Sequence, residues 1–409
     1  RALEQKDASP EIWVKLAEIF ERTRRAEEAA HLVDRALQSN AACAPALLLR
    51  ARLDRQAGRL EAAEKLLRAF PANAEPALRI SAAYQLGDIL DRQGRYDEAM
   101  AAFVEAKTLL KPLAERPAAE LQVMRTRINH VIANASAEVL RQWYDSAGQF
   151  PPGHRLALLG GHPRSGTTLL EQVLDAHPDI ISSEETEIFY QDAYGPLLRG
   201  HPDDTAMFAA LATATPAQLQ QARQNYFRAT ELSLGKPIAG RLLIDKNPSY
   251  TFLIPALARI FPEIKLLIAL RDPRDVVLSC FMQNLPPNQV GAAYLSLAST
   301  TGEYTALMGT WQTIKTRIRN PYLEVRYEDL LEDLESVARK TLDFLGVSWN
   351  PGVLKFDEHA RQKMVRSPTY ADVTQPVYKR AMGRWRNYQK YLEPHLEKLE
   401  PFVKAFGYD

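Results

Sequence analysis

The sequence is poor in cysteine, has almost no net charge and contains no long hydrophobic run. Its two cysteines, Cys43 and Cys280, lie far apart, which argues against a disulfide framework and favours a reducing compartment, so we expect the cytoplasm. The formal net charge of +1 gives no global attraction to nucleic acid or to an anionic membrane. The apolar runs fall well short of the roughly 18–20 residues that span a bilayer. The chain opens at Arg1 instead of a methionine, and we therefore expect a processed or partial chain.

The sequence does contain enough apolar material for well-packed domains. Hydrophobic residues make up 46% and charged residues 25% of the 409 residues, as in ordinary globular proteins. This length exceeds one typical domain, so we expect two or three. No grouping of histidine and cysteine in the sequence has the spacing of a zinc site, and we expect no bound metal.

The first third of the chain contains an internal repeat. Related phrases begin at residues 24, 58 and 94, so they recur after 34 and then 36 residues. A period of 34 is typical of tetratricopeptide repeats, each of which is a pair of antiparallel helices. Small residues such as Ala29 and Ala99 fall where helices approach, and large ones such as Trp13 and Phe103 fill the gaps.

We therefore predict an α-helical array of about three tetratricopeptide repeats over residues 1–116. Its concave face is expected to bind a peptide or protein partner, or a second subunit in a homodimer. Residues 119–146 then show helical periodicity with one apolar stripe, which predicts a connector or capping helix within residues 117–150. The cluster at 149–153, Gln-Phe-Pro-Pro-Gly, marks the start of a second domain at 151–409.

The second domain alternates apolar runs with helical patterns, which predicts an α/β fold with a central parallel sheet covered on both faces. Strands are predicted at 155–160, 241–245, 265–270 and 322–326. Helices are predicted at 167–176, 250–260, 273–284 and 329–345, with a helical insertion over about 190–235. Ligands of such a fold bind at the carboxyl ends of the strands.

One loop of this domain is similar to the P-loop of nucleotide hydrolases but lacks its lysine. Residues 161–168 read Gly-His-Pro-Arg-Ser-Gly-Thr-Thr and lie between a predicted strand and a predicted helix. A glycine-bearing turn there directs backbone N–H groups and the helix dipole at one anionic group. Thr167 stands where the hydrolase loop has its lysine. The loop therefore suits a nucleotide phosphate, but not a β/γ-phosphate with its metal ion.

A second motif, the run from Leu270 to Ser279, suits a separate phosphate. Arg271 lies at a predicted strand end, and Ser279 lies one to two turns into the next helix. Together with the loop at 161–168, this predicts a nucleotide that carries phosphate at two places.

These two motifs, in this order, resemble those of the sulfotransferase superfamily, and the resemblance covers roughly residues 155–409. It implies 3′-phosphoadenosine 5′-phosphosulfate (PAPS) as the donor, its 3′,5′-bisphosphate (PAP) as the product, and no metal, which accounts for Thr167. It also implies which residues bind the donor. The resemblance implies that the 5′-phosphosulfate is bound by Arg164, Ser165, Gly166, Thr167 and Thr168, and that the 3′-phosphate is bound by Arg271 and Ser279.

Within this superfamily the sequence looks most similar to the tyrosylprotein sulfotransferases. The glutamate pair before Thr186 resembles the pair whose second member is that family's catalytic base, which falls on Glu185. The segment 245–248, Asp-Lys-Asn-Pro, puts the family's catalytic lysine on Lys246. The phrase at 326–330 resembles one whose tyrosine lies near the nucleotide, here Tyr327. The C-terminal segment implies further donor contacts at Ser367 and Arg384.

The chemistry of sulfuryl transfer asks for the same residue types. A base must take the proton of the acceptor hydroxyl, and a cation must neutralise the phosphate oxygen that departs. Our hypothesis is that Glu185 is the base, that Lys246 stabilises the leaving oxygen and that Arg164 holds the sulfonyl group and phosphate. In-line placement of donor and acceptor is expected to supply most of the remaining rate.

Two departures leave the acceptor open between protein tyrosine, a glycan hydroxyl and a lipid hydroxyl. Animal tyrosine sulfotransferases carry an arginine after Glu-Glu-Thr, where this chain has Glu187. They are also disulfide-bonded membrane proteins of the secretory pathway, and nothing in this sequence suggests either property.

Two other classes of protein compete with a sulfotransferase. Thr167 speaks against a P-loop kinase, and the retained Glu185 and Lys246 speak against a non-enzymatic repeat adaptor.

Overall fold

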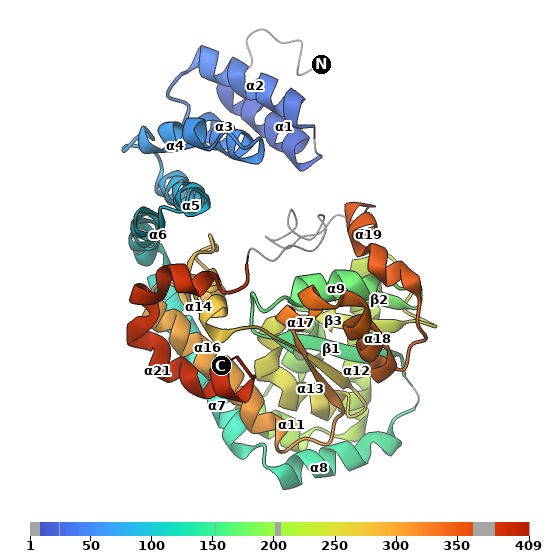
Figure 1. Ribbon diagram of the computed structural model, residues 1–409. Helices are drawn as coiled ribbons and strands as arrows, with labels where there is room; N and C mark the ends of the chain where they lie inside the picture. Colours follow the sequence, from blue (N-terminus) through green and yellow to red (C-terminus); the bar gives the residue numbers. More distant parts are fainter. Residues whose placement is uncertain (1–8, 24, 152, 201–205, 363–380, 409) are drawn as a thin grey trace. The chain divides into compact units, whose positions relative to one another are not determined.

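The computed structural model describes residues 9–23, 25–151, 153–200, 206–362 and 381–408 (Figure 1). The chain divides into two compact units. Unit 1 comprises residues 1–121, 281–300 and 387–391, and unit 2 comprises residues 122–280, 301–386 and 392–409. Two short segments of the C-terminal part, 281–300 and 387–391, thus group with the repeats. The domain limits at 116 and 150 stay predictions.

Unit 1 contains three consecutive helical hairpins, which confirms the predicted repeat array. The helices are α1 (Pro10–Arg22), α2 (Ala26–Ser39), α3 (Ala44–Gln56), α4 (Leu60–Arg68), α5 (Pro76–Arg92) and α6 (Tyr96–Leu110). One core cluster joins α1, α2 and α3 around Trp13, Leu32 and Leu49, and a second joins α3, α4 and α5 around Leu67 and Ile89. The repeats are therefore held by apolar burial between neighbouring helices, as expected for stacked repeats.

The third repeat shows why its helix needs a glycine. A Cβ on Gly87 of α5 would lie 2.7 Å from the ring of Phe103 on α6, so only glycine lets that ring approach. The segment 387–391 is bonded to the same repeat. Tyr388 donates to Asp91 over 2.7 Å, and Lys390 lies 2.8 Å from Asp97.

The predicted connector consists of two helices, α7 (Glu115–Asn134) and α8 (Ala137–Asp145), instead of one helix over 119–146. Ser136 divides them, because its Oγ caps α8 by accepting a 3.3 Å hydrogen bond from the amide of Val139. Along the chain, η1 (Lys111–Ala114) precedes α7 and η2 (Ser146–Gln149) follows α8, and unit 1 also contains α15 (Gln289–Ala292).

Unit 2 is built on a five-stranded sheet in the order β2-β3-β1-β4-β5, with all neighbouring strands parallel. The strands are β1 (Arg155–Gly161), β2 (Ile180–Glu184), β3 (Leu242–Lys246), β4 (Lys265–Leu270) and β5 (Tyr322–Arg326). Four of them match the predicted strands. The sequence analysis missed β2 because its five residues include Ser182 and Ser183, whose hydroxyls are buried in hydrogen bonds to carboxylates.

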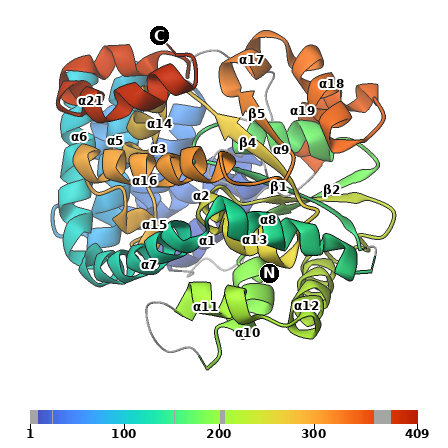
Figure 2. The ribbon, with the colours of Figure 1, turned by 90° about the horizontal axis from the view of Figure 1, so that it is seen from below.

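Helices cover both faces of this sheet. Helices α9 (Thr167–Asp175), α18 (Leu334–Leu345) and α19 (Phe356–Gln362) lie on one face, and α13 (Ile254–Ile260) lies on the other with α8 beside it (Figures 1 and 2). The other elements are η3 (Phe189–Tyr194), α10 (Gly195–Leu197), α11 (Ala206–Thr213), α12 (Pro216–Leu234), η4 (Pro248–Leu253), α14 (Pro273–Phe281), α16 (Leu297–Lys315), α17 (Tyr327–Glu332), η5 (Pro351–Lys355), η6 (Arg384–Tyr388) and α21 (Gln389–Ala405). None of the described helices is long and apolar enough to cross a membrane.

The strand order determines where a ligand can bind. The chain moves from β1 out to β2, returns to β3 and then crosses over to β4, so β1 lies between β3 and β4. Where the strand order changes direction in this way, a crevice opens at the carboxyl ends of the two strands on either side, here β1 and β4. The loop at 161–168 follows β1, and the Arg271 motif follows β4, so both phosphate motifs start at this crevice.

Candidate active site

The loop at 161–168 has a backbone that only glycine permits at two positions. Gly161 has a φ of 122°, and a Cβ there would lie 2.4 Å from the carbonyl oxygen of Ala269. Gly166, the N-cap of α9, has a φ of 93°, and a Cβ there would lie 2.5 Å from the ring of Tyr327. The hydroxyl of Ser165 donates to the carbonyl of His162 over 2.6 Å and closes the turn. The loop is thus a tight cradle at a helix N-terminus, where anions bind.

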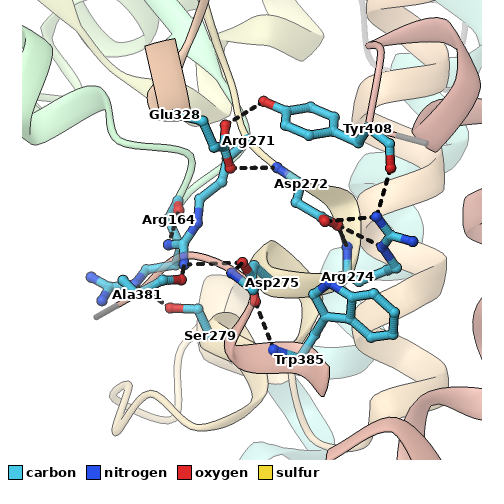
Figure 3. Close-up of polar contacts among 11 residues, drawn as sticks. Arg164, Arg271, Asp272, Arg274, Asp275, Ser279, Glu328, Ala381, Trp385 and Tyr408 are labelled. Atoms are coloured by element: carbon cyan, nitrogen blue, oxygen red, sulfur yellow. Dashed lines mark hydrogen bonds and ion pairs between the residues drawn. The ribbon is translucent and has the colours of Figure 1, made fainter. Parts of the chain in front are cut away.

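The two predicted phosphate motifs are in direct contact (Figure 3). Nε of Arg164 donates to Oγ of Ser279 over 3.1 Å, and Nη1 of Arg271 donates to the carbonyl of Arg164 over 3.2 Å. Arg271 is only 8% exposed, and its Nε has no hydrogen-bond partner among the described residues. We call this set, the loop at 161–168 with Arg271 and Ser279, the phosphate region.

Polar contacts from the C-terminal segment fix the second motif. The buried carboxylate of Asp275 accepts hydrogen bonds from the amides of Gly383, over 2.7 Å, and Trp385, over 2.8 Å. Burial raises the pKa of Asp275, against the attraction of Arg271. Arg384 lies between these two amides, half-buried at the start of η6, so it enters the neighbourhood of the motif. Ser367 lies outside the described residues.

Tyr327 lies where the sequence places it, against the phosphate region. Its ring packs against Gly166, where an added Cβ would lie 2.5 Å from the ring, and the guanidinium of Arg271 lies 5.0 Å from the ring centroid. The next residue, Glu328, accepts hydrogen bonds from the amide of Asp272, over 3.2 Å, and from the hydroxyl of Tyr408, over 2.6 Å. The ends of β4 and β5 are therefore tied together (Figure 3).

Glu185 and Lys246 form an ion pair at the ends of β2 and β3. Nζ of Lys246 donates to Oε1 of Glu185 over 2.8 Å, and the amide of Glu185 donates to the carbonyl of Lys246, also over 2.8 Å. The Lys246 side chain is completely buried, whereas that of Glu185 is 48% exposed. We call these two residues the acid–base pair. Lys246 is in register with Leu159 of β1, so this lysine lies on the strand beside the one that carries the loop.

Two side chains from the segment after β3 hold the turn that contains Glu185. The carbonyl of Thr186 accepts hydrogen bonds from Nδ2 of Asn247, over 3.0 Å, and from the hydroxyl of Tyr250, over 2.7 Å. Among the described residues, the left-handed non-glycine residues are Arg164, with a φ of 72°, and Glu185, with a φ of 41°. Such strained conformations cost of order 1–3 kcal/mol each and cluster at functional sites.

Two buried carboxyl groups near the pair were missed by the sequence analysis. Glu171 of α9 lies 3.5 Å from Nζ of Lys246. Asp245 accepts a 2.8 Å hydrogen bond from the hydroxyl of Tyr226, and burial raises its pKa to about 6. Asp245 directly precedes the predicted lysine, so its position in the sequence could have indicated it. For Glu171 the only signal was that a polar residue lies on an apolar helix.

The two histidines near the motifs have structural partners. His162 is buried, its Nδ1 lies 2.8 Å from the carbonyl of Pro163, and burial lowers its pKa to about 4, so the ring is neutral near pH 7. Nε2 of His177 lies 2.8 Å from the carbonyl of Ser348, and its Nδ1 accepts from the amide of Asp179. Neither geometry fits a solvent-accessible base.

Comparison with known proteins points to the same domains. Residues 157–351 match the model of the sulfotransferase family, and residues 80–109 match the tetratricopeptide repeat. An uncharacterised protein of Aquifex aeolicus (strain VF5) is 25% identical over 343 residues, which cover 80% of this chain and 42% of that protein. This chain therefore spans less than half of that relative's length.

Protein-tyrosine sulfotransferase 1 of Danio rerio is 28% identical over 262 residues, which cover 62% of this chain and 72% of that protein. Among solved structures, the sulfotransferase domain from the Synechococcus PCC 7002 olefin synthase is 24% identical and has a TM-score of 0.43. The match covers 62% of this chain and 97% of that chain. The sheet topology described above does not rely on it. Residues 157–351 thus match the sulfotransferase family, and tetratricopeptide repeats precede this part of the chain.

Proposed function

We propose that this chain transfers a sulfuryl group from PAPS to an acceptor hydroxyl, with Glu185 as the general base. The observation that carries the proposal is that two residues with different proposed roles both have a strained backbone conformation. Arg164 in the phosphate loop and Glu185 in the acid–base pair are the left-handed non-glycine residues of the described chain. Backbone strain at both places is the expected mark of residues held for function.

The residues of the phosphate region fit a nucleotide with phosphate at two places. Gly161 and Gly166 keep the loop free of Cβ atoms, and the start of α9 directs its amide groups outward. Arg271 is buried with an unpartnered Nε, which suits a second anionic group. The lysine of a kinase-type loop is replaced by Thr167, which is buried. PAPS, when bound, supplies an activated sulfuryl group; the chain supplies the groups that hold it.

The acid–base pair would carry out the proton and charge transfers. The half-exposed carboxylate of Glu185 is placed to take the proton of the acceptor hydroxyl as the new S–O bond forms. The bond from sulfur to the 5′-phosphate breaks with its electron pair on the phosphate oxygen, and the Lys246 ammonium would neutralise that oxygen. The products are a sulfate ester and PAP.

For the acceptor we propose a hydroxyl outside strongly acidic peptides, with protein tyrosine as the first candidate. The relative from Danio rerio is named a protein-tyrosine sulfotransferase. In this chain Glu187 is exposed beside the base and accepts a 2.7 Å hydrogen bond from Gln191, so it would repel acidic flanking residues. A glycan or lipid hydroxyl is the alternative. A peptide or second subunit on the repeats and a cytoplasmic location stay predictions.

The test titrates the protein with PAP and, separately, with ATP–Mg²⁺ while thermal unfolding is measured. We expect PAP to stabilise the protein by about 2.7 kcal/mol at 100 times its Kd. A larger response to ATP–Mg²⁺ would overturn the proposal in favour of a kinase. Incubation with ³⁵S-labelled PAPS and tyrosine peptides, flanked by either neutral or acidic residues, then identifies the acceptor. Label in glycan or lipid fractions of a lysate would select the alternative acceptors.

A further inference from the structure

The buried carboxylate of Glu171 has no part in the chemistry proposed above. It lies on α9, the helix that starts at the phosphate loop, and its side chain is completely buried. Its Oε2 lies 3.5 Å from Nζ of Lys246, and its Oε1 accepts a 2.8 Å hydrogen bond from the hydroxyl of Ser182 on β2. Glu171 therefore connects the loop helix to the lysine of the acid–base pair.

Lys246 depends on nearby carboxylates because its ammonium is removed from water. Burial by itself lowers the pKa of this lysine, but the attraction of Glu171 and then of Glu185 and Glu184 outweighs burial, and the pKa is raised. The fourth carboxyl group nearby, Asp245, points at Tyr226 and Ser183. Glu171 and Glu185 are thus the carboxylates in ion-pair distance of Nζ among the described residues.

These two carboxylates differ in what they can do during transfer. Glu185 is half exposed and can meet an acceptor hydroxyl, whereas Glu171 is completely buried and cannot. When Glu185 takes the acceptor proton it becomes neutral, and its attraction for Lys246 falls at the moment when the leaving oxygen needs a cation. A buried ammonium without a countercharge is strongly disfavoured. A second, permanently buried carboxylate removes this difficulty.

We infer that Glu171 is a positioning residue that holds the Lys246 ammonium in place while Glu185 gains and loses the acceptor proton. An ammonium has three N–H donors, so one can face each carboxylate and the third would be left for the departing oxygen when the donor is bound. The hydrogen bond from Ser182 fixes the orientation of Glu171. This inference rests on the proposed function, because it assigns Glu171 a role in the same site.

The first test follows thermal stability against pH without any nucleotide, for the wild type, Glu171→Gln and Glu303→Gln. Glu303 is a matched control, since it is a nearly buried carboxylate of the same unit that pairs with Arg125. A raised lysine pKa gives stability that is fully present below the unfolded-state pKa and is lost as pH rises from there through the folded-state pKa. Glu171→Gln lowers the folded-state pKa of Lys246, so we expect this variant to lose less stability over the alkaline range than Glu303→Gln. Parallel curves for the two variants would overturn the inference.

The second test measures the Kd of PAP and the pH dependence of kcat, the latter with the acceptor that the labelling experiment identifies. Loss of one negative charge favours both ionised Glu185 and neutral Lys246, so both limbs of the Glu171→Gln profile should move to lower pH. We expect kcat to fall by roughly 10–100-fold, as for a misplaced catalytic group, with the Kd of PAP unchanged. Glu171→Asp, which keeps the charge, should restore the limbs. A lower kcat with unmoved limbs would mean a merely structural role.

Failure of the inference and failure of the proposed function give different results. A wild type that transfers no sulfate from PAPS rejects the proposed function, while the stability test without nucleotide still judges Glu171. If Glu171→Gln does not fold, Ser182→Ala tests the same idea by releasing Glu171 without removing its charge. A fall in kcat with moved pH limbs and unchanged PAP binding would support the inference, and a wild-type kcat with wild-type limbs would overturn it.

Discussion

The phosphate region and the acid–base pair lie at the ends of neighbouring strands, yet they are built differently. In the phosphate region, backbone groups and cations bond to each other, as in the contacts of Arg164 with Ser279 and of Arg271 with the Arg164 carbonyl. In the acid–base pair, one buried cation lies among carboxylates, and one of these carboxylates is half exposed. A preformed cradle suits holding a donor, whereas a partly exposed carboxylate on a buried lysine suits moving a proton.

The difference predicts that substitutions in the two regions separate binding from turnover. Changes in the phosphate region should weaken the donor complex, and changes in the acid–base pair should slow transfer from a complex of normal affinity. The division of labour can therefore be tested by substitutions at five residues.

Among the substitutions around the base Glu185, Lys246→Ala is expected to have the largest effect. Removing the cation at the leaving oxygen should lower kcat by about 10²–10³, with PAP affinity retained. Lys265→Ala is the matched control, because Lys265 lies at the opposite end of the sheet on β4 and donates to the carbonyl of Phe344 over 2.8 Å. Steady-state rates and circular dichroism of both variants check this. A wild-type kcat in Lys246→Ala would break the comparison.

Arg271→Ala should act on binding. Losing a charge-assisted contact worth about 1.5–3 kcal/mol should weaken PAP by roughly 10–100-fold. AMP, which has no 3′-phosphate, should bind the variant and the wild type alike. Calorimetric titrations with both nucleotides measure this. Equal weakening of PAP and AMP would remove Arg271 from the 3′-phosphate site.

Gly166→Ala should damage the cradle by a smaller amount. Alanine must adopt a φ of 93° and also displace the Tyr327 ring, at a cost of about 1–3 kcal/mol. Gly235→Ala controls for the backbone term, since Gly235 has a φ of 61° but a Cβ added there would meet no atom within 4 Å. Urea unfolding and PAP titration compare them. If Gly235→Ala lost as much PAP affinity, the contact with Tyr327 would be irrelevant.

The smallest effect concerns pH and the support beneath the acid–base pair. Burial raises the pKa of Asp245 to about 6, from an ordinary value of 3.8. The native state therefore holds the proton longer than the unfolded state, and this group makes stability fall as pH rises between these two values. Asp245→Asn should flatten that part of the curve. Urea unfolding from about pH 4 to 7 measures the slope, and an unchanged slope contradicts the assignment.

Much of this arrangement could be predicted from sequence because local signals carried it. The spacing of Gly161 and Gly166, the strand-end position of Arg271 and the 34-residue repeat each depend on neighbours along the chain. Strand β2 could not be recognised, because two buried serines interrupt its apolar pattern and are satisfied only by Glu171 and Asp245 from other elements.

The contacts between distant segments were equally invisible. Nothing local to Glu171 indicates that it reaches Lys246, since that depends on how α9 packs against β3. The bonds from Asp275 to the amides of Gly383 and Trp385 link positions about a hundred residues apart. The sequence indicates candidate residues, and packing decides what holds them.

The most direct test of the division of labour is Glu185→Gln, with PAP affinity and single-turnover transfer of ³⁵S-labelled sulfate measured on the same preparation. The substitution keeps the shape of the side chain and removes its ability to accept a proton. We expect the Kd of PAP to stay at the wild-type value while transfer is lowered by about 10²–10⁴. Wild-type transfer with wild-type PAP affinity would contradict the account, because the proton would then leave by another group.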